Sequence, residues 1–181
     1  MKILCFIRVF ALLIAFAFFQ ACDCASAAEP EIIGSAQFSN QVHQALALLA
    51  SKDGEAYAIV TNYVGRIQEG EHSGMWAYKT PPTFELNDTT AFYSITWCAA
   101  TIAHDSFHSK LYHDYQQTHE GDVPAFMCVG TDAEKQCMTH QLAVMEQIGA
   151  SKREIDYAKT MADGHYAKDS ESWGSYSNRN W

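Results

Sequence analysis

The feature that most constrains the fold is a stretch of 26 residues, from Thr90 to Tyr115, that contains neither glycine nor proline: TAFYSITWCAATIAHDSFHSKLYHDY. Asn87 and Asp88 precede it, and both residue types cap helix N-termini well. The stretch therefore predicts one long helix over residues 90–115. Its first half is apolar on nearly every side, which is typical of a buried helix. We expect the rest of the chain to pack around it.

Periodicity in the flanking segments predicts more helices. Apolar residues recur at helical spacing over residues 39–52 and 55–68, although β-branched residues in the second segment also allow a strand. After a loop over residues 117–130, helices are expected over residues 133–148 and 151–162. Residues 28–35 and the tail after residue 163 have no clear pattern.

Two short segments predict strands. Residues 74–79 (GMWAYK) and 83–86 (TFEL) are rich in aromatic and apolar residues and are separated by Pro81 and Pro82. They are typical of a hairpin or of the edge of a small sheet. The predicted fold class is therefore α+β: a mostly helical single domain with a small β-hairpin or sheet beside the central helix.

The start of the chain has the layout of a secretory signal. Lys2 and Arg8 form a basic start, residues 9–19 are all apolar, and Ala25, Ser26 and Ala27 form an A-x-A cleavage site. We predict a signal peptide over residues 1–27 and one domain over residues 28–181. The apolar run is shorter than the about 20 residues that span a bilayer.

Cys22 offers an alternative route of processing. It follows the apolar run as in a bacterial lipoprotein, so the signal would then cover residues 1–21 and the mature chain would be lipid-anchored. Membrane association is expected only in that case. Both routes export the protein, which we expect to be periplasmic or secreted.

The charge of the mature chain excludes some partners. Without residues 1–27, the 12 basic and 21 acidic residues become 10 and 20, so the net charge is −10. Nucleic-acid binding depends on Lys and Arg contacts to phosphates, and anionic membranes attract the same side chains. We therefore expect no nucleic-acid partner.

The cysteines of the mature chain predict one disulfide. Cys128 and Cys137 flank a short loop, and an oxidising compartment favours a bridge between them. Cys98 lies in an apolar run and is expected to be a buried thiol. The chain has no C-x-x-C, so a zinc site built from cysteines is not expected.

The long helix carries a pair of candidate metal ligands. His104 and His108 are four residues apart and therefore share one helix face. Ile102, Ala103 and Phe107 surround them with apolar side chains. Asp105 directly follows the first histidine. Two imidazoles on one face can bind one metal ion, provided that a third ligand joins them.

The segment His104-Asp105-Ser106-Phe107-His108 resembles the HExxH helix of zincin metallopeptidases, with aspartate in place of glutamate. The resemblance, which covers roughly residues 70–150, implies a minimal zincin-like fold. It implies that Zn²⁺ is bound by His104, His108 and, as in gluzincins, a glutamate on a later helix. Glu134 is the expected third ligand, and Glu146 is the next choice.

The resemblance also implies catalytic roles. Asp105 would act as the general base on the metal-activated water, or else would orient a histidine. Tyr112 and His165 are candidates for supporting the oxyanion. A substrate would lie antiparallel along an edge strand, for which residues 72–78 (HSGMWAY) are the candidate.

These features predict an exported zinc-dependent hydrolase that cleaves amides in a peptide or cell-wall-like substrate. One alternative is a non-catalytic envelope binding protein that retains the fold. Another is a metal phosphohydrolase, since His104 and Asp105 also form an adjacent His-Asp pair.

Overall fold

The computed structural model describes residues 28–164. The predicted signal peptide and His165 lie outside the described residues. In chain order the elements are β1 (Glu31–Ile33), α1 (Ala36–Lys52), α2 (Gly54–Tyr63), β2 (Arg66–Glu69), β3 (Gly74–Trp76), β4 (Thr83–Leu86), α3 (Asp88–Ala91), α4 (Ile95–Thr118), α5 (Phe126–Val129), α6 (Thr131–Gln147) and α7 (Lys152–Gly164). The mostly helical α+β fold with a small sheet is confirmed.

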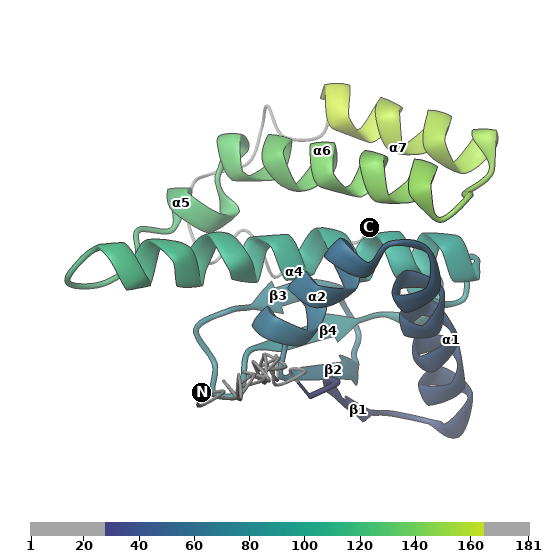
Figure 1. The fold of residues 1–181 in the computed structure, drawn as a ribbon, viewed down its shortest axis with the longest axis horizontal. Coiled ribbons are helices and arrows are strands. Elements are labelled where there is room, and N and C mark those ends of the chain that lie inside the picture. Colours follow the sequence, from purple (N-terminus) through teal and green to yellow (C-terminus); the bar gives the residue numbers. More distant parts are fainter. Residues whose placement is uncertain (1–27, 165–181) are drawn as a thin grey trace, which may run out of the picture.

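Helix α4 runs through the middle of the molecule (Figure 1). Helices α6 and α7 cover one side of it, while α1, α2 and the sheet lie on the other. Every residue from Trp97 to Ala103 is buried, as the apolar first half of the segment predicts. Within residues 28–164, no helix has both the length and the apolar character needed to cross a membrane.

The prediction of a single helix over residues 90–115 is wrong at its start. The segment forms two helices, α3 and α4, because Ser94 begins a new helix by accepting a hydrogen bond from the Trp97 backbone N–H (2.9 Å). Asn87 caps α3 in the same way through the Thr90 N–H (2.8 Å). Two good capping residues seven positions apart thus outweigh the helical pattern between them.

A four-stranded sheet in the order β1-β2-β4-β3 forms beneath α4. The predicted helix over residues 55–68 is correct only as far as Tyr63, because Arg66–Glu69 forms strand β2. Strand β2 pairs in parallel with both β1 and β4, and these long-range hydrogen bonds outweigh local helical periodicity. Strand β1 and the short helix α5 were not expected.

The predicted hairpin between residues 74 and 86 is confirmed. Strand β3 pairs antiparallel with β4, with the buried Met75 opposite the buried Phe84. It lies at the edge of the sheet, and it contacts α4. The sheet therefore presents an antiparallel edge strand beside the histidine helix.

Candidate metal centre

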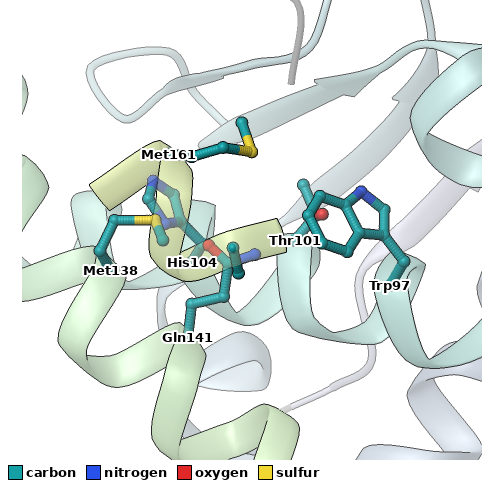
Figure 2. Close-up of a pocket in the computed structure, with 7 residues that line it drawn as sticks. Trp97, Thr101, His104, Met138, Gln141 and Met161 are labelled. Carbon is teal, nitrogen blue, oxygen red and sulfur yellow. The ribbon is translucent and has the colours of Figure 1, made fainter. Parts of the chain in front are cut away.

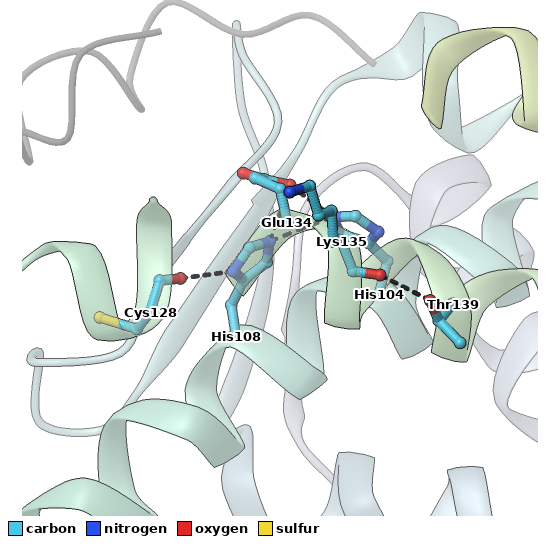
Figure 3. Close-up of polar contacts among 6 residues, drawn as sticks. All are labelled: His104, His108, Cys128, Glu134, Lys135 and Thr139. Carbon is cyan, nitrogen blue, oxygen red and sulfur yellow. Dashed lines mark hydrogen bonds and ion pairs between the residues drawn. The ribbon is translucent and has the colours of Figure 1, made fainter. Parts of the chain in front are cut away.

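Helix α4 places its two histidines side by side in the interior. His104 and His108 are both buried, and their Nε2 atoms lie 3.0 Å apart (Figure 3). One helical turn separates them, which is the spacing that brings side chains together on one face. The structure thus confirms that the two imidazoles converge.

Helix α6 adds a carboxylate to this pair. Glu134 is fully buried, and its Oε2 lies 3.4 Å from Nε2 of both His104 and His108. Burial is the largest influence on the pKa of Glu134 and raises it, but the two imidazoles outweigh burial and bring it well below its usual range. Glu146, the other predicted candidate, is exposed on the same helix.

The charge of Glu134 acts in turn on His108. Burial is the largest single influence on the pKa of His108 and lowers it, but Cys137 and Glu134 together bring it well above its usual value. The negative charge of Glu134 thus favours a positive charge at this point of the interior. A divalent cation would supply the same positive charge.

A backbone carbonyl orients His108. The Nδ1–H of His108 donates to the carbonyl oxygen of Cys128, in α5 (Figure 3). A carbonyl can only accept, so Nδ1 carries the proton and Nε2 presents its lone pair to the site. Metal-binding histidines commonly have such a partner on the second ring nitrogen. The unexpected helix α5 therefore has a role at the site.

A cysteine completes the group. A ring nitrogen of His104, a ring nitrogen of His108 and the Cys137 thiol lie within 4.8 Å of one another, and all three residues are buried. This buried group could hold a metal ion. Burial, the largest cause, raises the pKa of the Cys137 thiol to about 11; the charges of Glu134 and Asp105 add to this, while His108 lowers it.

The predicted disulfide between Cys128 and Cys137 is wrong. The described cysteines, Cys98, Cys128 and Cys137, are all buried free thiols. The Cys128 thiol donates to the Ala125 carbonyl oxygen (3.7 Å) within its own short helix, whereas Cys137 lies against the imidazoles. Cys98 is a buried thiol, as predicted, and burial raises its pKa to about 12.

Sequence reasoning missed Cys137 as a member of the site. The signal was available: Cys137 follows Glu134 by three residues, so the predicted helix over residues 133–148 places both on one face.

The predicted catalytic residues lie in different environments. Asp105 is fully buried, and its carboxylate is close enough to Cys137 to raise the pKa of that thiol. Tyr112 is half-buried and lines a surface hollow of about 400 Å³ together with Tyr78, Asp122 and Val123. Asp105 is therefore in the interior within electrostatic reach of Cys137, whereas Tyr112 borders the surface hollow.

The side of His104 that faces α7 is closely covered. Figure 2 shows His104 beside Thr101 of α4, Met138 and Gln141 of α6, and Met161 of α7. The cavity between them measures about 10 Å³. That volume is about enough for one water molecule. Access to His104 from this side requires side chains or α7 to move.

Comparisons with known proteins do not place this chain in a family. No protein-family model, no curated protein and no solved structure matches it.

Proposed function

We propose that the protein is an exported metal-dependent hydrolase that binds zinc through His104, His108 and Glu134 and cleaves amide bonds. One observation carries the proposal: Nε2 of both histidines and Oε2 of Glu134 converge, with separations of 3.0, 3.4 and 3.4 Å. These side chains come from two helices and meet in the interior.

These separations match the requirements of zinc. Protein ligands lie about 2.0–2.2 Å from Zn²⁺, so tetrahedral geometry separates nitrogen and oxygen ligand atoms by about 3.3–3.6 Å. Two of the observed distances fall in that range, and the third is slightly shorter. Two imidazoles and one carboxylate form a donor set that zinc favours. The Cys128 carbonyl supports the ligand role of His108.

When bound, zinc polarises a carbonyl and lowers the pKa of its water to about 7. Asp105 follows His104 on the same helix and would accept the proton of the attacking water. Aspartate is one methylene shorter than the zincin glutamate. Its burial supports this role, because the carboxylate is near enough to Cys137, which lies against the imidazoles, to raise the pKa of that thiol.

The edge strand supports a peptide-like substrate. Within the described residues, β3 pairs with β4 alone, so an extended peptide could add to its other edge once the groups that cover the buried Gly74 and Met75 move. Residues 72–78 include β3, and Tyr78 borders the hollow that Tyr112 also lines. A peptide or cell-wall peptide bound there would lie next to α4, which contacts β3.

Burial favours a second candidate, a non-catalytic metal-binding protein. His104, His108, Glu134 and Cys137 are each at most 2% exposed, and the cavity beside His104 holds about one water molecule. A structural metal site is closed, whereas a catalytic site keeps a position open for water or substrate. Turnover of casein and of cell-wall fragments separates the two candidates.

Metal content tests the shared core of both candidates. Purified mature protein is expected to hold one zinc ion per chain, measured by mass spectrometry of the metal. His108→Ala and Glu134→Gln should each lose most of it, because each removes one of three ligands. The matched controls are His43→Ala, on the exposed face of α1, and Glu146→Gln, exposed on α6. Full zinc occupancy in both site variants would contradict the proposed ligands.

A further inference from the structure

We propose that Cys137 is a fourth protein ligand, so that the resting metal site is closed by a thiolate. The supporting geometry is a pair of helices that each contribute two ligands one turn apart. Helix α4 provides His104 and His108, and α6, which runs antiparallel to it, provides Glu134 and Cys137 (Figure 1).

The distances place the thiol within reach of a shared ion. The Cys137 thiol and one ring nitrogen of each histidine lie within 4.8 Å of one another. Tetrahedral zinc bonds of about 2.3 Å to sulfur and about 2.0 Å to nitrogen would separate those atoms by about 3.5 Å. A rotation of the Cys137 side chain or a small shift of α6 covers the difference. Glu134 already lies 3.4 Å from both imidazoles.

The surroundings favour a thiolate over a water molecule. Cys137 is completely buried, and so are the other three donors. The cavity that adjoins His104 has room for about one water molecule and is lined by Met138 and Met161 rather than by charged groups. A thiol that is already in the interior can occupy the fourth position without opening the core.

A thiolate ligand changes the metal selectivity of the site. Sulfur ligands select zinc, cadmium, cobalt and copper(I) over magnesium and calcium, which prefer oxygen. We therefore expect Cd²⁺ and Co²⁺ to bind and Mg²⁺ to be excluded. This step rests on the proposed function: if the protein is a hydrolase, the thiolate also takes the position of the attacking water. Cys137→Ala should then hydrolyse peptides faster than the wild type.

Cobalt absorption provides a test that does not depend on activity. Wild-type protein kept reduced with a phosphine and loaded with Co²⁺ should show the visible bands of four-coordinate cobalt and a near-ultraviolet thiolate-to-cobalt charge-transfer band. Cys137→Ser should lose the charge-transfer band, keep the visible bands and bind Co²⁺ at least about tenfold more weakly. Cys128→Ser and Cys98→Ser are the matched controls and should keep both the visible bands and the charge-transfer band.

The outcomes separate the two proposals. Visible cobalt bands without a charge-transfer band in the wild type would overturn Cys137 ligation and leave the three-ligand site intact. A charge-transfer band that is still present in Cys137→Ser would also overturn ligation by Cys137. A band that depends on Cys137, with no hydrolysis by Cys137→Ala, would establish the thiolate ligand and overturn the hydrolase. Failure of the wild type to bind Co²⁺ would overturn both the thiolate ligand and the metal-dependent hydrolase.

Discussion

In the proposed hydrolase, Asp105 is the candidate general base, because it is the acid next to the two candidate ligands on α4. It is fully buried and lies near Cys137. A carboxylate on this short side chain must lie close to the attacking water in order to take its proton. Its role differs from that of Glu134, which lies 3.4 Å from both imidazoles.

We expect Asp105→Asn to lower kcat on a peptide substrate by about 10²–10⁴-fold, because general-base catalysis contributes that much. Zinc content should stay unchanged, since the amide preserves the shape of the side chain. The measurement is made in the wild type and in Cys137→Ala. Asp132→Asn, whose side chain is 90% exposed, is the control. Unchanged kcat in both backgrounds would exclude Asp105 as the base.

Local spacing explains which site residues could be predicted. His104 and His108 follow from a four-residue interval on one helix, whereas Glu134 was expected only through the resemblance to gluzincins, with Glu146 as the next choice. The Cys128 carbonyl could not be predicted, since every residue has a carbonyl and only the backbone path selects one. The grouping of Cys137 with the imidazoles requires knowledge of which face of α6 packs on α4.

At the scale of elements, Glu154 links α7 to the start of α4 through hydrogen bonds. Its carboxylate accepts hydrogen bonds from the Ser94 hydroxyl, the Thr96 hydroxyl (2.8 Å) and the Ser151 backbone N–H (2.8 Å). Burial is the largest influence on its pKa and raises it, but these hydrogen bonds, those from Ser151 first, lower it to about 2. The same helix carries Ala158 and Met161, which cover His104.

This lowered pKa predicts a loss of stability in acid. The folded carboxyl titrates at about 2 and the unfolded one near about 4.3, so the stabilisation is complete above about pH 5 and is lost as the pH falls to about 2. At pH 7, Glu154→Gln should lower the free energy of unfolding by about 1–3 kcal/mol.

Urea unfolding at pH 7 and pH 3 measures this effect. The difference between Glu154→Gln and the wild type should shrink at the lower pH, because at pH 3 the unfolded chain takes up a proton at this carboxyl while the folded carboxyl stays mostly ionised. Glu146→Gln, on the exposed face of α6, should differ little from the wild type at either pH. A constant difference for Glu154→Gln would show that its charge is not what holds α7.

Gly130 sets the distance between α5 and α6. A β-carbon added there would lie 2.9 Å from the Phe126 carbonyl oxygen and 3.0 Å from its Cα. Gly130→Ala should therefore separate the two helices, which carry the Cys128 carbonyl and Glu134. We expect a loss of about 1–3 kcal/mol of stability and weaker zinc binding.

Thermal unfolding and zinc titration check this prediction. Gly54→Ala is the control, because a β-carbon at Gly54 meets no atom within 4 Å and α2 begins there. The control should bind zinc as the wild type does. Equal zinc affinity in Gly130→Ala would show that the helix junction tolerates the extra carbon.

Elements that depend on distant partners were the hardest to predict. Residues 66–69 continue the helical periodicity of α2, yet they form a central strand because β1 and β4 flank them. Strand β1 has three residues, too few to show an alternating pattern. The helices over residues 39–52, 133–148 and 151–162 were predicted to within a few residues, because each has its own apolar periodicity, although Gly130 starts α6 without a side-chain cap.

At the scale of the whole molecule, the candidate metal site lies between the two halves of the fold. The histidines belong to the helix that packs on α1, α2 and β3, whereas Glu134 and Cys137 belong to the layer formed by α6 and α7. An ion bound between them would stabilise the packing of one layer on the other, since the unfolded chain does not hold the four candidate donors together.

Removal of the metal should therefore lower the melting temperature of the whole domain. At a free zinc concentration about 1,000 times Kd, binding stabilises the fold by about 4 kcal/mol, or about 10 °C in a domain of this size. Differential scanning calorimetry with and without a chelator measures the shift. His108→Ala should show no chelator-dependent shift. A wild-type melting temperature that the chelator leaves unchanged would contradict a zinc ion between the layers.

The carbonyl that holds His108 has a consequence for mutational tolerance. The acceptor is a main-chain oxygen, so no replacement of the Cys128 side chain deletes it. The chain can change residue 128 to another small residue that packs there and still orient the imidazole. Insertions, deletions and prolines between α5 and α6 would displace the oxygen. In a library of variants, replacing residue 128 by other small residues should therefore keep the orientation of His108. Changing the length of the chain between α5 and α6 should disturb it.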